Sequence, residues 1–256
     1  MGKILLLRKK RLTALACALA AALIFYVVNY PYAATAAATN RQLPIYCVQR
    51  DQKMVAISFD AAWGNEDTQE LIDIMDRYDV TATFFVVGSW VDKYPESVKA
   101  LSDAGHEVMN HSDSHAHMSQ LSTQEIVADL NACNDKIEAV TGVRPTLIRP
   151  PYGEYDDHVI TAIRSMGMEP IQWDVDSLDW KDLSASEITQ RVVNKVQPGS
   201  IVLFHNAALH TPEALPGIIE TLLQEGYTFV PISQIILPGE CGTDYTIDHT
   251  GRQCPC

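Results

Sequence analysis

From residue 53 onward, apolar positions along the chain follow two alternating patterns. Short apolar runs rich in β-branched and aromatic residues are typical of buried strands. Between them lie single stretches in which apolar residues recur every three or four positions, as in amphipathic helices. The predicted strands are residues 54–59, 81–87, 107–110, 146–149, 169–175, 200–205 and 227–231. The predicted helices are residues 68–78, 96–104, 122–140, 157–166, 184–196 and 213–224.

Strands that alternate with single helices indicate parallel pairing through right-handed crossovers. Such crossovers build either a (β/α) barrel or an open doubly wound sheet. The sequence contains neither a glycine-rich dinucleotide turn nor a P-loop. We therefore expect an α/β fold, a distorted (β/α) barrel of about seven parallel strands.

The first 40 residues have the pattern of a membrane-targeting segment. Five basic residues between positions 3 and 11 precede an uncharged apolar stretch at 12–28, close to the shortest length that spans a bilayer. The basic flank predicts a cytoplasmic N-terminus and an extracytoplasmic body. Small residues at 33–38 leave a cleaved signal peptide as the alternative. We expect one N-terminal transmembrane helix in the cell membrane, or secretion if the segment is cleaved.

These patterns divide the chain into a basic stub with its anchor at 1–40, a catalytic body at 41–238 and a cysteine-rich tail at 239–256. Cysteines near both ends of the body suit disulfides in an extracytoplasmic compartment, although their connectivity stays open. Outside the apolar segment, one cysteine is at a helical core position and four flank the body or lie in the tail: Cys133, and Cys47, Cys241, Cys254 and Cys256.

Charge excludes one large class of function. The chain has 19 Lys and Arg against 32 Asp and Glu, a formal net charge of -13. The five basic residues at positions 3–11 lie ahead of every acidic one, so the body is more negative still. A body of this charge repels phosphate backbones, and we expect no nucleic-acid partner.

Unusual polar residues follow the predicted strands where these end. In a parallel barrel these positions share the carboxyl-terminal rim, where catalytic groups gather. Two histidines four residues apart suit a metal, an Asp and an Arg suit an ion pair, and a His beside an Asp suits a proton donor. The residues are Asp60, His111, His115, Arg149, Asp179 and His205.

Each position also has a purely structural alternative. Asp60 could cap the helix that follows it, and the segment 149–153 could be only a rigid turn. The two histidines could lie on the surface, and His205 could be a hydrogen-bonded core residue. The common rim favours the chemical interpretation, because chance would scatter these residues to both ends of the strands.

The order of these segments resembles the five motifs of the polysaccharide deacetylase family (NodB homology, carbohydrate esterase family 4). The motifs cover roughly residues 53–237. In sequence order they are Ser-Phe-Asp at 58–60, His-Ser-Asp-Ser-His at 111–115, Arg-Pro-Pro-Tyr-Gly at 149–153, Asp-Ser-Leu-Asp-Trp at 176–180 and Leu-Phe-His at 203–205. The resemblance implies a distorted (β/α) barrel that removes acetyl groups from N-acetylated sugars with a divalent metal, zinc being our expectation.

The resemblance also implies a role for each matching residue. Asp60 corresponds to the general base, with Arg149 holding it, and His205 to the general acid, tethered by Asp179. His111 and His115 correspond to metal ligands. The substrate-binding positions are Tyr152, whose backbone N–H corresponds to an oxyanion donor, and Trp180 and Leu203, which correspond to walls of the acetyl methyl pocket.

One position departs from the family pattern. The first motif usually has a second Asp, a metal ligand, where this chain has Ala61. Two protein ligands remain where catalytic zinc usually has three. Water or substrate could fill the third position, Asp113 could replace the missing carboxylate, or the protein could bind without catalysis. We expect weakened metal binding with activity retained.

These observations predict a membrane-anchored or secreted deacetylase of N-acetylated glycan, with peptidoglycan as its substrate. The Phe-Asp-Ala-Ala-Trp-Gly version at 59–64 is similar to a sporulation-type subgroup of deacetylases. A catalytically impaired glycan-binding barrel in cell-wall assembly is the alternative that Ala61 supports. Hydrolysis of a non-sugar amide on the same fold is a weaker one.

Overall fold

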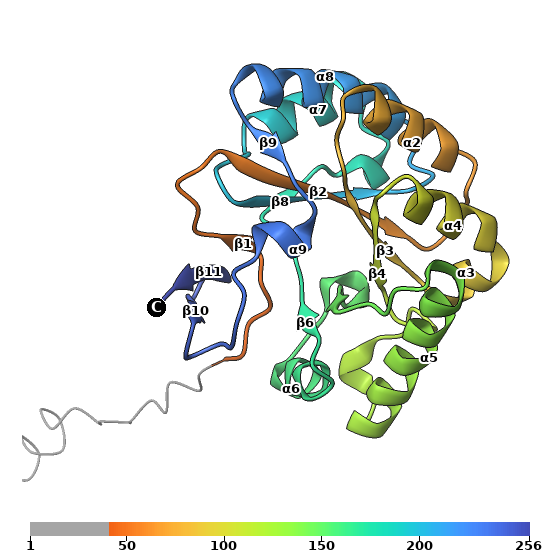
Figure 1. Ribbon diagram of the computed structural model, residues 1–256, viewed down its shortest axis with the longest axis vertical. Helices are drawn as coiled ribbons and strands as arrows, with labels where there is room; N and C mark the ends of the chain where they lie inside the picture. Colours follow the sequence, from red (N-terminus) through yellow and green to blue (C-terminus); the bar gives the residue numbers. More distant parts are fainter. Residues whose placement is uncertain (1–40) are drawn as a thin grey trace, which may run out of the picture. The chain divides into compact units, whose positions relative to one another are not determined.

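The apolar runs form the central strands of one sheet (Figure 1). A computed structural model describes residues 41–256, of which 42–256 form one unit. Within this part of the chain the strands are β1 (Cys47–Val48), β2 (Met54–Ala61), β3 (Thr83–Val86), β4 (Glu107–Asn110), β5 (Leu147–Ile148), β6 (Glu169–Pro170), β7 (Val175–Asp176), β8 (Ser200–His205), β9 (Thr228–Phe229), β10 (Tyr245–Ile247) and β11 (Arg252–Pro255).

The sheet is a half-barrel of mainly parallel strands rather than the closed barrel that we expected. Its order is β10-β11-β1-β8-β2-β3-β4-β5-β6, with β7 paired to β8 and β9 paired to β2. The strands from β8 to β6 pair in parallel. After β6 the chain returns to the other side of the sheet, where β7 pairs with β8 over only two residues.

The predicted strand at 169–175 is interrupted, which explains why the sheet is a half-barrel. Pro170 has no N–H to donate to a ladder. Asp174 then takes over a ladder position with its side chain, because its carboxylate accepts hydrogen bonds from the Ile201 N–H (2.8 Å) and the Ser200 hydroxyl (2.8 Å). The segment therefore splits into β6 and β7.

Helices surround the strands in an arc (Figure 1). They are α2 (Thr68–Arg77), α3 (Gly88–Lys93), α4 (Pro95–Asp103), α5 (Thr123–Thr141), α6 (Asp157–Ser165), α7 (Ala185–Val193), α8 (Thr211–Gln224) and α9 (Ile232–Ile235), with short 3₁₀ turns η1 (Met118–Gln120), η2 (Pro151–Gly153) and η3 (Asp179–Lys181). The capping boxes at Ser122 and Ser184 form as predicted. Helices α3 and α9 were not predicted, and they have only six and four residues.

The core between sheet and helices is built on stacked aromatic rings. Phe59 of β2 stacks on Phe84 of β3 (ring centroids 4.7 Å apart) and on Phe204 of β8 (5.5 Å). All three rings are buried. Alternate residues of the same strands, Asp60 and His205 among them, face the other side of the sheet, since strand side chains alternate. Packing the phenylalanines therefore fixes where these polar residues point.

The segment 239–256 continues the sheet. Strands β10 and β11 form a hairpin, and β11 pairs in parallel with β1. Five cysteines of the described residues are free thiols: Cys47, Cys133, Cys241, Cys254 and Cys256. The predicted membrane anchor lies in residues 1–40, outside the described residues. No helix within residues 41–256 combines the length and apolar character needed to cross a membrane.

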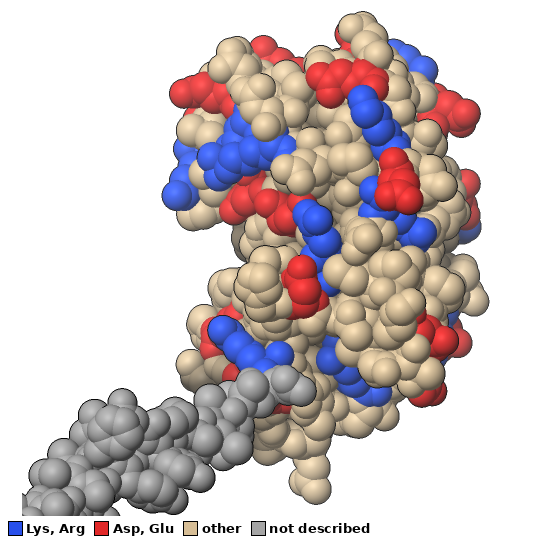
Figure 2. Space-filling model, turned by 90° about the vertical axis from the view of Figure 1, so that its left-hand side faces the viewer, with Lys and Arg blue, Asp and Glu red and all other residues tan. Residues whose placement is uncertain are grey.

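Charged side chains of both signs are interspersed on the face shown in Figure 2, where Asp and Glu adjoin many of the Lys and Arg residues. Within residues 41–256 several charged side chains are paired, such as Lys99 with Asp103 (2.7 Å) and Arg144 with Asp135 (2.7 Å). These pairs are largely exposed and contribute little to stability.

One buried side chain of the C-terminal hairpin yields a prediction about stability. Gln253 is fully buried, its Oε1 accepts from the Leu237 N–H (2.7 Å), and its Nε2 donates to the Leu237 carbonyl (3.0 Å). Gln253→Ala leaves both backbone groups without these partners and should lower the free energy of unfolding by about 1–3 kcal/mol. Urea unfolding measures this loss. The matched control is Gln234→Ala, at an exposed position of α9, with an expected change within about 0.5 kcal/mol; equal effects would contradict the prediction.

Candidate active site

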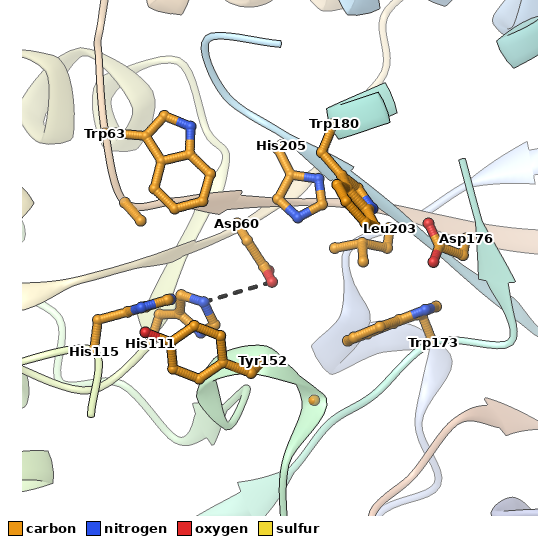
Figure 3. A pocket seen from close by; sticks show the side chains of 12 residues that line it. Asp60, Trp63, His111, His115, Tyr152, Trp173, Asp176, Trp180, Leu203 and His205 are labelled. Carbon is orange, nitrogen blue, oxygen red and sulfur yellow. Dashed lines mark ion pairs between the residues drawn. The ribbon is translucent and has the colours of Figure 1, made fainter. Parts of the chain in front are cut away.

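A cleft of about 480 Å³ opens at the carboxyl ends of the central strands (Figure 3). Seven of the nine residues singled out from the sequence line it. The other two, Arg149 and Asp179, are fully buried against Asp60 and His205. The volume is in the range of small-molecule sites.

Asp60 and Arg149 form a buried ion pair at the floor of the cleft. Asp60 is near the end of β2, and its Oδ1 lies 2.8 Å from Arg149 Nη1. Arg149 Nη2 also donates to the Ser58 hydroxyl (2.9 Å) and the Gln172 carbonyl (3.2 Å). Burial by itself raises the pKa of Asp60, but the charge of Arg149 outweighs burial and lowers it. The carboxylate is therefore ionised at neutral pH.

His111 is fixed in one tautomer by the backbone carbonyl of Arg149. Its Nδ1 lies 2.6 Å from the Arg149 carbonyl oxygen, which can only accept, so Nδ1 carries the hydrogen. Its Nε2 then presents a lone pair 3.5 Å from Asp60 Oδ2. Two acceptors facing each other are an arrangement that a cation stabilises. A ligating histidine also commonly donates its second nitrogen to a carbonyl in this way.

His115 completes a pair of neutral imidazoles. Its ring centroid is 5.1 Å from that of His111. Burial lowers the pKa of both histidines, that of His115 to about 4. Neutral imidazole is the form that binds metals.

The loop that carries His115 is held by its own hydrogen bonds and by helix α5. Ser112 and His115 both have positive φ, 67° and 54°. The His115 N–H donates to the Ser112 hydroxyl (2.8 Å). Asp129 of α5 accepts from the Asp113 N–H (2.8 Å) and the Ser114 hydroxyl (2.5 Å). These contacts offset the strain of left-handed backbone.

His205 stands across from Asp60 on the adjoining strand, in direct register in the β2–β8 pairing. Its Nδ1 donates to Asp179 Oδ1 (2.8 Å), and Asp179 Oδ2 accepts from the His205 N–H and the Thr211 hydroxyl, both at 2.8 Å. Burial alone lowers the pKa of His205, but the hydrogen bond and charge of Asp179 outweigh it and raise the pKa. His205 can therefore hold a proton near neutral pH.

Aromatic and apolar side chains form the walls (Figure 3). Trp180 and Leu203 line the cleft as predicted, and so does Tyr152, whose backbone is left-handed with φ 61°. Trp63 and Trp173 also line it, although the sequence alone did not predict a role for either. Only Trp63 could have been found from the sequence, because it lies three positions after Asp60 in the first motif.

The structure does not supply a third ligand at the position of the missing Asp. Ala61 is fully buried in an apolar cluster with Phe59 and Phe204. Asp113 Oδ1 is instead paired with Lys136 Nζ of α5 at 2.6 Å, so the hypothesis that Asp113 substitutes is not supported. Among residues 41–256, no three His, Cys, Asp or Glu side chains are grouped to hold a metal. The donor set is two imidazoles that fit zinc chemistry, one fewer than usual.

Comparison with known proteins identifies the family of the chain. The sequence model of a family described as "Polysaccharide deacetylase" matches residues 48–171. The chain is 38% identical over 188 residues to the Bacillus subtilis peptidoglycan-N-acetylmuramic acid deacetylase PdaC, covering 73% of this chain and 40% of that protein. It spans less than two thirds of the length of PdaC and of YlxY from the same organism (60%).

Two solved structures are also similar. The PdaC structure has a TM-score of 0.66 at 39% identity and covers 73% of this chain and 92% of that one. BA3943, described as a "CE4 family pseudoenzyme" from Bacillus anthracis, has a TM-score of 0.72 at 38% identity, covering 75% of this chain and 68% of that one. A BA3943 mutant is described as having restored enzymatic activity. The chain therefore belongs to the polysaccharide deacetylase family, carbohydrate esterase family 4.

The buried ion pair yields a prediction about stability and pH. Arg149→Met removes the cation from Asp60 and should lower the free energy of unfolding at pH 7 by about 3–5 kcal/mol. In the native protein the lowered pKa of Asp60 stabilises the fold above the unfolded pKa of about 3.9 and this stabilisation fades below it. In the variant, burial without Arg149 raises the pKa of Asp60, so the difference should shrink as the pH falls from 7 towards 4.

Urea unfolding at several pH values measures both effects. Arg144→Met is the matched control, because Arg144 pairs with Asp135 and Glu138 while 43% of its side chain is exposed. We expect little change there at any pH. A difference for Arg149→Met that stays constant with pH would contradict the assignment.

Proposed function

We propose that this chain is a metal-dependent hydrolase that removes N-acetyl groups from an extracytoplasmic glycan, with peptidoglycan as its substrate. One observation carries the proposal: an ionised carboxylate and a proton-holding imidazole face each other in one cleft, each fixed by its own buried partner. Asp60 has Arg149, and His205 has Asp179. General base and general acid need such opposite proton states at the same pH.

Each residue of the cleft has a separate role in amide hydrolysis. Asp60 accepts a proton from the water that attacks the acetyl carbonyl carbon. His205 gives its proton to the sugar nitrogen as the C–N bond breaks, which releases acetate and leaves an amine. The Tyr152 backbone N–H stabilises the oxyanion. Trp180 and Leu203 enclose the acetyl methyl group.

His111 and His115 would hold the divalent metal, for which we propose zinc. When bound, such a metal supplies Lewis-acid polarisation and lowers the pKa of water. Because Ala61 contributes no carboxylate, we propose weaker binding than in family members that have an Asp at this position. The neutral state of both imidazoles supports their role.

Several relatives support peptidoglycan as the substrate. PdaA of Bacillus subtilis is named as a peptidoglycan-N-acetylmuramic acid deacetylase. PgdA of Listeria monocytogenes is named as a peptidoglycan-N-acetylglucosamine deacetylase. The basic and apolar pattern of residues 1–28 supports a membrane-anchored chain whose body meets this polymer outside the cytoplasm. The sporulation-type motif at 59–64 extends the proposal to spore peptidoglycan.

Acetate release from N-acetylated glycans tests the function directly. The full chain in mild detergent is incubated with peptidoglycan, with added zinc or cobalt and with a chelator. We expect release that depends on metal, because two imidazoles bind it reversibly. His205→Ala is the control for site-specific catalysis and should lower turnover by about 10²–10⁴-fold with little change in metal content. Equal release with and without chelator would contradict metal dependence.

A second candidate is a catalytically silent glycan-binding barrel in cell-wall assembly. Ala61 and the similarity to the pseudoenzyme BA3943 favour it. Folded protein that binds glycan but releases no acetate with any metal would support this candidate instead.

Restoring the missing carboxylate yields a separate prediction. Ala61→Asp should raise zinc affinity by at least about tenfold, because the family pattern has a metal-binding Asp at this position and two imidazoles are one ligand fewer than zinc usually has. Calorimetric titration of the metal-free protein measures this. Leu209→Asp places the same charge on an exposed residue outside the cleft lining and should give no gain in zinc affinity. Unchanged affinity in Ala61→Asp would mean that another group already fills the third position.

A further inference from the structure

The exposed aromatic side chains of the described residues are confined to one place. Six large apolar side chains within residues 41–256 are exposed, and three of them are aromatic: Trp63, Tyr152 and Trp180. All three line the cleft. Leaving large rings in water forgoes the stabilisation of burying them, so a cluster of exposed rings indicates a binding surface.

Trp63 is presented by a rigid main chain. Asn206 Nδ2 donates to the carbonyls of Trp63 (2.6 Å) and Gly64 (2.7 Å), and Trp90 Nε1 donates to the same Gly64 carbonyl (2.6 Å). Gly64 has φ +55°, and a Cβ there would lie 2.6 Å from the Ala207 Cβ. The backbone under the indole is therefore tied to the residues that directly follow His205.

The indole lies on one side of His205 and Trp180 lies on the other (Figure 3). The Trp63 ring is nearly parallel to the His205 imidazole, with an interplanar angle of 9° and centroids 6.4 Å apart, and it meets His115 edge-on at 6.3 Å. More than half of the surface of Trp63, 54%, is exposed. Contact with the imidazole thus leaves much of the indole open to a ligand.

A sugar chain matches this open surface. The C–H groups of a pyranose ring form an apolar face that packs on an aromatic ring, while its hydroxyl groups stay in water. If the acetyl group of the reacting sugar enters between His205 and Trp180, as the proposed function requires, the neighbouring sugar extends toward Trp63. A single N-acetylated sugar would leave the Trp63 ring uncovered.

We infer that Trp63 is a substrate-binding residue that stacks on the sugar next to the one being deacetylated, so that the site selects a glycan chain over a single sugar. The inference rests on the proposed glycan substrate, and it goes beyond that proposal by assigning Trp63 a role in chain-length selection.

The test compares oligomers of N-acetylglucosamine, from monomer to tetramer, as probes. Their affinity for the full chain in detergent is measured by calorimetry with chelator present, so that the oligomers are not consumed. We expect the native protein to bind the tetramer better than the monomer. Trp63→Ala should weaken tetramer binding at least about fivefold, as for loss of an aromatic stacking partner, and leave the monomer unchanged. Trp63→Phe should restore most of the tetramer affinity.

Trp180→Ala is the matched control, because its ring serves the reacting sugar and its loss should weaken both lengths alike. Leu209→Ala, 69% exposed and outside the cleft lining, should change neither. Native protein that binds the tetramer no better than the monomer would overturn the inference. Equal losses for both lengths in Trp63→Ala, or no loss at all, would overturn it too.

Acetate release measured on the same proteins separates this inference from the proposed function. Length-dependent binding through Trp63 without any release of acetate would sustain the role of Trp63 and refute the deacetylase activity. Metal-dependent release with no length effect at Trp63 would refute the role of Trp63 alone.

Discussion

The site depends on one buried ion pair, that of Arg149 and Asp60. A guanidinium with no exposed surface is costly unless its charge is paired and its N–H groups find acceptors. Asp60 pairs the charge of Arg149, and the Ser58 hydroxyl and the Gln172 carbonyl accept from its Nη2, while its Nε has no hydrogen-bond partner within residues 41–256. The ring of Phe85, whose centroid is 4.3 Å from its guanidinium carbon, covers it. Arg149 also orients His111, because its backbone carbonyl accepts from His111 Nδ1. One residue therefore sets both the charge of the Asp60 carboxylate and the tautomer of the His111 imidazole.

The second pair joins His205 and Asp179, and it favours the protonated form of its titrating group, whereas the first pair favours the deprotonated form. Arg149 keeps Asp60 deprotonated, whereas Asp179 favours the protonated form of His205. Because β2 and β8 place Asp60 and His205 in register, the two proton states meet in one cleft. Both pairs are present although this chain has Ala61 where the family pattern has a second Asp.

Local sequence patterns predicted most helices and strands, because capping and hydrophobic periodicity depend on residues close together in the chain. Strand β4 lies at its predicted bounds, and the boxes at Ser122 and Ser184 start α5 and α7. Helix α3 was missed because its six residues, which include a Gly and a Trp, show no capping side chain and too few turns for periodicity. The C-terminal hairpin was missed for another reason. Its pairing partner, β1, lies about 200 residues earlier in the chain, and short polar strands gain their hydrogen bonds only from such distant partners.

The sequence by itself determined the kinds of chemistry in the site, because residue types and their order at strand ends are local properties. It determined that Asp60, His111, His115 and His205 would share one rim, since parallel strands end on one side. Only the tertiary structure decided which groups touch. It paired Asp113 with Lys136 rather than directing it into the cleft, and it left the sheet a half-barrel because Asp174 interrupts the strand at 169–175. It also turned Trp63 toward His205, a choice that depends on Asn206 and Trp90, more than 25 residues away in sequence. Contacts between distant residues are set by packing of the whole chain, which local pattern does not encode.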